Sequence, residues 1–144
     1  MKKIYSYILL QIILGFTFVA MAQDQPKTNK EWTIENCVNQ FDASKTVPTK
    51  VGYQYWFADK DFIDGRTLKM SVVAPHEATH APHTHLEDEF FFVLEGKALF
   101  ILNGDSVEAE PYASFYCPSG VEHGIRNIGD TELKYLVVKT YLKK

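Results

Sequence analysis

The chain is poor in arginine and cysteine, with two residues of each among its 144 residues. Arg66 and Arg126 cannot form a basic stripe along a phosphate backbone, and the formal net charge is −3, so we expect no nucleic-acid partner. A glycine-rich phosphate loop, a heptad run and internal repeats are also absent. A hydrophobic content of 46% over 144 residues predicts one ordinary globular domain.

The two cysteines, Cys37 and Cys117, stand far apart in sequence. They lack the C-x-x-C spacing of a zinc knuckle or a thioredoxin-like site. A disulfide between them and two separate thiols are both compatible with the sequence, because bridging depends on the distance between their Cα atoms.

The one long hydrophobic run lies at the N-terminus. Lys2 and Lys3 precede an apolar stretch over residues 4–20, and Ala20-Met21-Ala22 follows it. This pattern predicts a signal peptide over residues 1–22, whose removal leaves 122 residues with a net charge of −5. An uncleaved anchor is the alternative, but the polar Gln11 weakens it. We therefore expect an exported protein, periplasmic or extracellular, with no stable membrane association after cleavage.

The rest of the chain has the pattern of a β protein. Residues 23–48 begin with a polar stretch and predict a flexible N-terminal arm. From residue 49 to residue 144, short apolar segments alternate with glycine, proline, asparagine and aspartate, which predicts an all-β barrel or sandwich. The expected strands cover residues 53–57, 67–73, 90–94, 98–102, 114–117 and 133–142.

One predicted strand is apolar on both faces. Phe90 and Phe92 share one face, and Phe91 and Val93 share the other. One face can fill an interior, so the other needs a cover from another sheet, the N-terminal arm or a second subunit. A homodimer is therefore one expected assembly.

Four side chains suggest a metal site. His83 and His85 are two residues apart, which in a strand directs both rings to one face. Glu89 follows at the start of the next apolar segment, and His123 comes from a later strand. Three imidazoles and a carboxylate are a typical ligand set for one divalent transition metal, and leave positions open for water or substrate. Zn, Mn, Fe and Ni all fit this set.

The same residues belong to two longer patterns. Residues 83–96 read H-x-H-x3-E-x6-G, and residues 118–127 read P-x-G-x2-H-x3-N. They resemble the two halves of the cupin motif. This resemblance implies a double-sheeted, jelly-roll-like cupin β-barrel as a single domain, with one metal held inside by His83, His85, Glu89 and His123. The glycines that usually open the two halves are missing: Glu77 replaces the first, and the second falls near Tyr112.

Further residues are candidates for lining a substrate cavity. Phe91 and Val93 share the parity of Glu89 and should face the metal. His76 lies upstream of the ligand pair, where a substrate contact and a solvated loop are both open readings. Tyr55 either lines the cavity or packs in the core.

Three more polar side chains have open roles. His80 is either a base near the metal or a loop residue. Arg66 and Lys69 either meet a substrate carboxylate or lie on a solvated edge.

The resemblance and the ligand set lead to a functional hypothesis. A divalent metal can act as a Lewis acid on a small-molecule substrate and stabilise an enediolate or alkoxide. Export favours a sugar or uronate-like substrate. Isomerases of that kind occur among small cupins, so the resemblance implies isomerase or lyase chemistry. An Fe(II)-dependent dioxygenase and a non-catalytic small-molecule-binding protein are the alternatives.

Overall fold

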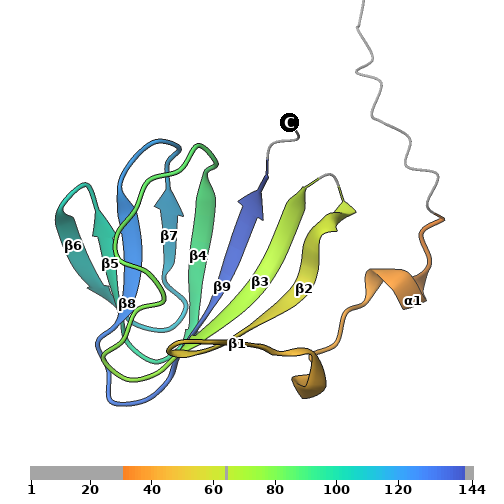
Figure 1. Ribbon diagram of the computed structural model, residues 1–144, viewed down its shortest axis with the longest axis horizontal. Coiled ribbons are helices and arrows are strands. Elements are labelled where there is room, and N and C mark those ends of the chain that lie inside the picture. Colours follow the sequence, from red (N-terminus) through yellow and green to blue (C-terminus); the bar gives the residue numbers. More distant parts are fainter. Residues whose placement is uncertain (1–30, 64, 142–144) are drawn as a thin grey trace, which may run out of the picture. The chain divides into compact units, whose positions relative to one another are not determined.

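The computed structural model describes residues 31–63 and 65–141 (Figure 1). The predicted signal peptide and residues 23–30 of the predicted arm lie outside this range. From Thr33 onward the chain forms one compact unit. Among the described residues, no helix has the length and hydropathy needed to cross a membrane.

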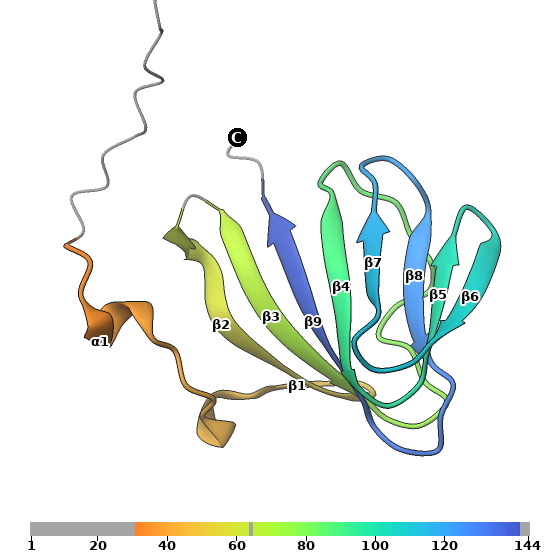
Figure 2. The ribbon, with the colours of Figure 1, turned by 180° about the vertical axis from the view of Figure 1, so that it is seen from behind.

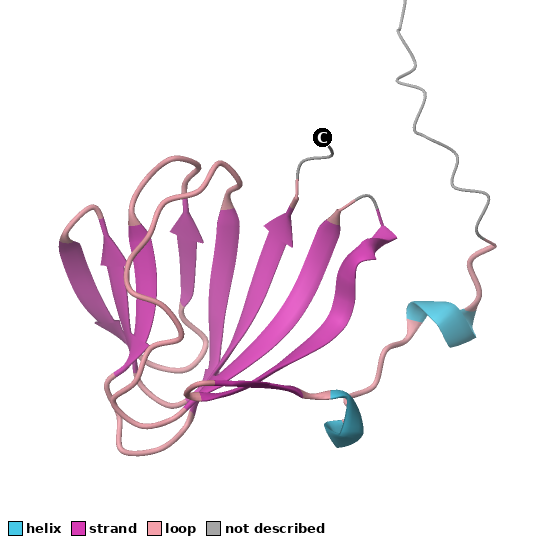
Figure 3. Cartoon of the chain, viewed as in Figure 1, coloured by secondary structure: helices cyan, strands magenta, loops and turns pink. Residues whose placement is uncertain are grey.

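The compact unit consists of antiparallel strands in two sheets (Figure 3). The larger sheet has the strand order β1-β2-β3-β9-β4-β7, and the smaller has the order β6-β5-β8. This confirms the expected all-β, double-sheeted barrel. The elements are α1 (Ile34–Cys37), the 3-10 helix η1 (Ala43–Lys45), β1 (Val47–Thr49), β2 (Gly52–Ile63), β3 (Arg66–Val73), β4 (Glu89–Glu95), β5 (Ala98–Leu102), β6 (Asp105–Ala109), β7 (Ser114–Cys117), β8 (His123–Asn127) and β9 (Leu133–Thr140).

The last part of the predicted arm packs on the larger sheet (Figure 2). Strand β1 pairs with β2, so the strands begin at Val47, ahead of the expected boundary at residue 49. The Phe41 ring meets the Tyr55 ring at 4.9 Å, and the Tyr55 hydroxyl donates a hydrogen bond of 2.9 Å to the carbonyl of Gln40. The arm residues therefore cover one face of β2 and bury Tyr55.

A hydrophobic core fills the space between the two sheets. Val93, Ala98 and Leu133 are fully buried in it. The Phe100 ring stacks on the Phe115 ring at 4.7 Å and joins the smaller sheet to the larger one. Removing a valine, leucine or phenylalanine side chain of this core from water contributes about 1.5–3 kcal/mol to the stability of the fold.

The outer face of the larger sheet is partly apolar and exposed. Phe90 pairs with Tyr116 on β7 and with Val138 on β9, and their side chains remain 48%, 46% and 48% exposed, respectively. The predicted two-sided character of β4 is therefore present: Phe91 faces inward, and Phe90 faces outward.

Two turns show how backbone conformation follows the sequence. Gly96 has φ 86°, and a Cβ there would lie 2.5 Å from the carbonyl oxygen of Glu132, so only glycine fits the turn. Tyr112 lies where the second motif usually has its glycine, and it adopts a left-handed conformation with φ 71°. A tyrosine is strained there, since its Cβ crowds the backbone at positive φ.

Candidate metal centre

Two segments bring the predicted ligands together. The β3–β4 loop, residues 74–88, runs beside β8 (Figure 1). His83 and His123 form an isolated antiparallel bridge in which each amide donates to the other's carbonyl at 3.0 Å. The amide of Gly120 donates to the carbonyl of His85 at 2.9 Å. His83 and His85 thus lie in a loop and not in a strand. Backbone hydrogen bonds to β8 and to the turn before it, not a pleat, hold both rings beside His123.

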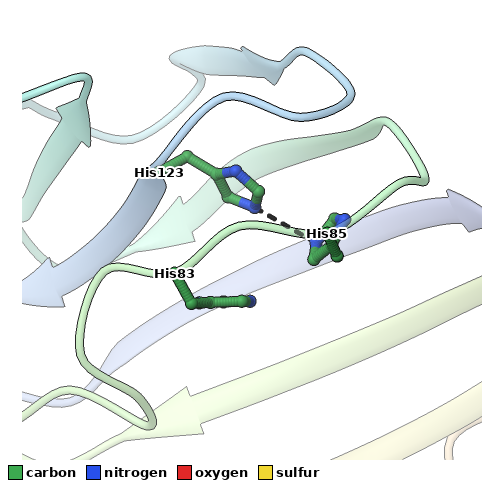
Figure 4. A group of neighbouring side chains, drawn as sticks. All are labelled: His83, His85 and His123. Carbon is green, nitrogen blue, oxygen red and sulfur yellow. Dashed lines mark hydrogen bonds between the residues drawn. The ribbon is translucent and has the colours of Figure 1, made fainter.

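The ring nitrogens converge on one point (Figure 4). One ligand atom from each of His83, His85 and His123 lies within 4.8 Å of the others. Nε2 of His123 is 3.2 Å from Nε2 of His85 and 3.1 Å from Oε1 of Glu89. Nε2 of His85 is 3.4 Å from the same carboxylate oxygen. His85, Glu89 and His123 therefore form one tight cluster, and His83 lies beside its two histidines, within 4.8 Å of their ligand atoms.

Backbone carbonyls fix the tautomer of all three imidazoles. Nδ1 of His83 donates to the carbonyl of Ala81 at 3.3 Å, and Nδ1 of His85 donates to that of Glu87 at 2.6 Å. Nδ1 of His123 donates to the carbonyl of Val121 at 2.8 Å. A carbonyl only accepts, so each Nδ1 carries the proton of the neutral ring and each Nε2 keeps its lone pair. The Nε2 atoms face the shared point.

This arrangement fits a bound cation. Nε2 of His85, Nε2 of His123 and Oε1 of Glu89 meet at 3.1–3.4 Å, close enough to share a proton or to bind one cation. His123 is fully buried and Glu89 is 7% exposed, so little water reaches the space between them. Ligands about 2.1 Å from a shared ion, at angles of about 90–109°, are about 3.0–3.4 Å apart. The spacing therefore matches the donor set of one transition metal.

Lys139 and Cys117 flank the Glu89 carboxylate. Nζ of Lys139 is 3.9 Å from Oε2 of Glu89, while Oε1 faces the imidazoles. Cys117 lies opposite Glu89 on β7, and with His123 these residues form a second group of donor atoms within 4.8 Å. Burial, with a smaller effect of Glu89, raises the pKa of the Cys117 thiol to about 12. The protonated sulfur is a poor ligand at neutral pH.

The cluster opens into a cavity of about 560 Å³, a volume typical of small-molecule sites. Apolar side chains of Phe91, Ile125 and Val137 line it near the cluster. The wall on β3 is polar, since Thr67, Lys69 and Ser71 face inward; their apolar neighbours alternate with them. The cavity thus has an apolar surface beside the cluster and, on β3, a polar wall that can form hydrogen bonds.

The structure separates the four predicted cavity-lining residues. Phe91 lines the cavity. Val93 shares its parity but lies farther along β4, where it is fully buried in the core. Tyr55 faces the arm, and His76 lies in an exposed loop, where its Nε2 is 2.9 Å from Oδ1 of Asp130. These last three are not among the cavity-lining residues.

The other open candidates also separate. His80 and Lys69 line the cavity, whereas Arg66 is exposed and is not among its lining residues. Cys37 is exposed and Cys117 is buried, each as a free thiol.

Sequence reasoning missed several cavity residues. Tyr135 and Lys139 on β9 face inward beside Ser71 and Glu89, because the register pairs them directly. The hydroxyls of Tyr135 and Thr79 are 3.2 Å apart, and burial raises the pKa of Tyr135, which stays protonated. The sequence shows which β9 residues share a face, but it does not show that β9 pairs with β3 and β4.

Asn127, the last residue of the second motif, supports the backbone next to the metal cluster through its side chain. Its buried amide nitrogen donates to the carbonyls of Val73 at 3.0 Å, Ala74 at 3.0 Å and Thr131 at 2.8 Å, and its oxygen accepts from the amide of Gly129. It therefore ties β8 to the start of the ligand-bearing loop.

Comparison with known families gives a match over most of the barrel. Residues 69–139 match a family described as a cupin domain. This range contains all four predicted ligands and the strands from β4 to β8, together with most of β3 and β9.

One protein is similar to this chain in sequence, and two solved structures have a similar fold. An uncharacterized protein of Methanocaldococcus jannaschii is 34% identical over 71 residues, which are 49% of this chain and 57% of that protein, so the chain spans little more than half of that relative. A predicted oxalate decarboxylase of Thermotoga maritima is 26% identical, with a TM-score of 0.58 over 62% of this chain and 80% of that one. A sugar phosphate isomerase of Silicibacter pomeroyi is 22% identical, with a TM-score of 0.54 over 61% and 59%.

Proposed function

Because the chain belongs to the cupin superfamily and its His/Glu cluster opens into a small cavity, we propose that it is a metal-dependent enzyme with isomerase or lyase chemistry. Its substrate is a small, oxygen-rich molecule of the sugar or uronate type. The observation that carries this proposal is that Nε2 of His85, Nε2 of His123 and Oε1 of Glu89 lie 3.1–3.4 Å from one another beside the cavity.

His83, His85, Glu89 and His123 would hold the metal. When bound, a divalent transition metal supplies Lewis acidity that polarises a substrate oxygen and stabilises negative charge on it. His83 is the most exposed of the three histidines and lines the cavity, so a substrate would reach the cluster past His83. The carbonyls of Ala81, Glu87 and Val121 hold the rings in the ligating tautomer.

Other cavity residues bind and orient the substrate. The Tyr135 hydroxyl is buried and protonated, and can donate its proton in a hydrogen bond to a substrate oxygen. Phe91, Ile125 and Val137 exclude water beside the cluster, which strengthens electrostatic interactions there. Lys139 holds the outer oxygen of Glu89 and so keeps Oε1 turned toward the imidazoles.

The Thermotoga relative supports chemistry of this kind on a small acid. That protein is described as a predicted oxalate decarboxylase, a name that refers to a small, oxygen-rich acid. At 26% identity this supports the class of reaction and not a particular substrate for this chain.

Activity under argon tests the proposal. The protein loaded with Mn, Zn or Ni should convert sugars or uronates without oxygen, as followed by NMR of the reaction mixture. Oxygen uptake that requires iron would instead identify the dioxygenase alternative. Ligand binding without turnover by any metal form would identify the non-catalytic alternative.

Two expectations about the protein's setting also stand as proposals. We propose cleavage after Ala22 and export, and mass spectrometry of the exported protein should find Gln23 as its first residue.

We also propose that the exposed strip of Phe90, Tyr116 and Val138 is covered by a second copy. Sedimentation should then detect a dimer that Phe90→Asp dissociates.

A further inference from the structure

The cavity is basic although the whole chain is acidic. Its lining residues include three lysines, Lys50, Lys69 and Lys139, but Glu89 as their one carboxylate. The formal net charge of the chain is −3. Charge of the opposite sign concentrated in a cleft indicates the charge of the ligand, since it raises the local concentration of anions.

The three lysines differ in how their charge is balanced. Lys139 is 12% exposed and lies 3.8 Å from Oε2 of Glu87 and 3.9 Å from Oε2 of Glu89. Lys50 is exposed at the rim, where solvent screens it. Lys69 is partly buried, and no carboxylate of the described residues forms an ion pair with it. Lys69 is therefore the inward cation whose charge the described residues leave unbalanced.

The neighbours of Lys69 hold it toward the cavity. Its Nζ lies 5.2 Å from the centre of the Trp56 ring, and Trp56 is its direct partner on β2. Such a contact orients an ammonium group without neutralising it. Gln54 and Ser71 form the next pair along the same face and also line the cavity. An amide, a hydroxyl and an ammonium group thus share one patch of wall.

The distance to the metal cluster suits one small molecule. Strand β9 lies between β3, which carries Lys69, and β4, which carries Glu89. Adjacent strands are about 4.8 Å apart, and the register places Lys69 level with Phe91, two residues along β4 from Glu89. The Cα atoms of Lys69 and Glu89 are therefore about 12 Å apart across the sheet. A molecule the size of a sugar acid can reach Lys69 with one end and the cluster with the other.

The chemistry of the wall favours a carboxylate over a phosphate. Tightly bound phosphates usually meet arginine forks, helix N-termini or nests of backbone amides. Among the described lining residues there is no arginine, and none lies in a helix. One ammonium group with amide and hydroxyl neighbours matches a singly charged acid.

We infer that Lys69, with Gln54 and Ser71 beside it, binds the carboxylate of an acidic substrate whose other oxygens face the His/Glu cluster. This inference rests on the proposed function and narrows its substrate class to sugar acids. Burial lowers the pKa of Lys69, and Glu89 opposes that effect. A bound carboxylate would add to the stabilisation of the ammonium form.

Calorimetric titration tests the inference. The probes are glucuronate, galacturonate and gluconate, their neutral counterparts glucose and galactose, and inorganic phosphate, each added to the metal-loaded protein. The wild type should bind at least one acid more tightly than its neutral counterpart and than phosphate. Lys69→Met should weaken acid binding about tenfold or more, since a charged hydrogen bond is lost, and leave neutral sugars unaffected.

Arg66→Met is the matched control, because Arg66 is an exposed basic residue on the same strand. It should leave acid binding unchanged. Lys69→Gln, a second variant, should reproduce the loss if Lys69→Met proves unstable. Equal binding of acids and neutral sugars by the wild type, full acid affinity in both Lys69 variants, or tighter binding of phosphate would each overturn the inference.

Elemental analysis of the same samples separates the two proposals. A wild type without metal contradicts the proposed function, while acid binding that depends on Lys69 still supports the subsite. If the wild type holds metal and turns substrate over, but acids bind equally well without Lys69, the proposed subsite is wrong and the proposed function still stands.

Discussion

The backbones of His83 and His123 exchange two hydrogen bonds of 3.0 Å, although the residues are far apart in sequence. This bridge joins the ligand-bearing β3–β4 loop to the first residue of β8. The loop is thereby held against the barrel by the protein's own backbone, and the ligand cluster is preformed.

A preformed site predicts slow amide exchange without metal. In the metal-free protein, the amides of His83, His123 and Gly120 should exchange about 100-fold or more slowly than in an unstructured chain, corresponding to about 2.8 kcal/mol. Hydrogen exchange followed by NMR measures this. Unprotected amides at these positions, beside protected amides in β4, would show that the loop is ordered only when metal binds.

Asn127 is predicted to be important for stability. Asn127→Ala removes the hydrogen bonds to the carbonyls of Val73, Ala74 and Thr131, of which the bond to Val73 is buried. The free energy of unfolding should fall by about 2–4 kcal/mol, measured by denaturant titration. Asn39→Ala, at an exposed position in the arm, should change it by less than about 0.5 kcal/mol. Equal effects of the two substitutions would contradict the assigned role.

Tyr112 should be replaceable with a gain in stability. Its φ of 71° costs a tyrosine about 1–2 kcal/mol, and the ring is 79% exposed. Tyr112→Gly removes that strain but increases the freedom of the unfolded chain, so we expect a net gain of roughly 0.5–1 kcal/mol. Thermal unfolding measures it, with Tyr112→Phe as a neutral control. A glycine variant less stable than the wild type would mean that the ring contributes contacts that outweigh the strain.

Acid should destabilise the metal-free protein through His83. Burial lowers the pKa of His83, so below about pH 6.5 the unfolded chain takes up a proton that the folded chain resists. Stability contributed by His83 is therefore present above that pH and is lost as pH falls toward the lower folded value. The effect is small because solvent reaches this exposed ring. Melting temperatures between about pH 7.5 and 5.5 should fall less in His83→Gln than in the wild type; parallel profiles would contradict this.

Local features of the fold were predictable from the sequence. Gly96 and Gly120, the glycines present in the two motif patterns, have φ 86° and 75°, a conformation that glycine adopts without strain. Alternation within β4 correctly placed Phe91 inward with Glu89, because side-chain direction within a strand is a local property. The ligand spacing carried the resemblance to the cupin motif, and the match of residues 69–139 to a cupin domain confirms that family.

Features that depend on pairing between distant segments were not predictable. Alternation gives the face of Val93 but not how far along the barrel it lies, and it is in the core. The face of Tyr55 depends on which side of β2 the arm covers. Lys139 meets Glu89 only because β9 is inserted between β3 and β4, a strand order that no single segment encodes.

The most direct test of the account is the metal content of the purified protein by elemental analysis. The wild type should carry about one equivalent of a divalent transition metal per chain. The double variant His83→Ala, His123→Ala should carry almost none while its circular dichroism still reports a β-sheet fold. Unchanged metal occupancy in that double variant would contradict the assignment of the His/Glu cluster as the metal site.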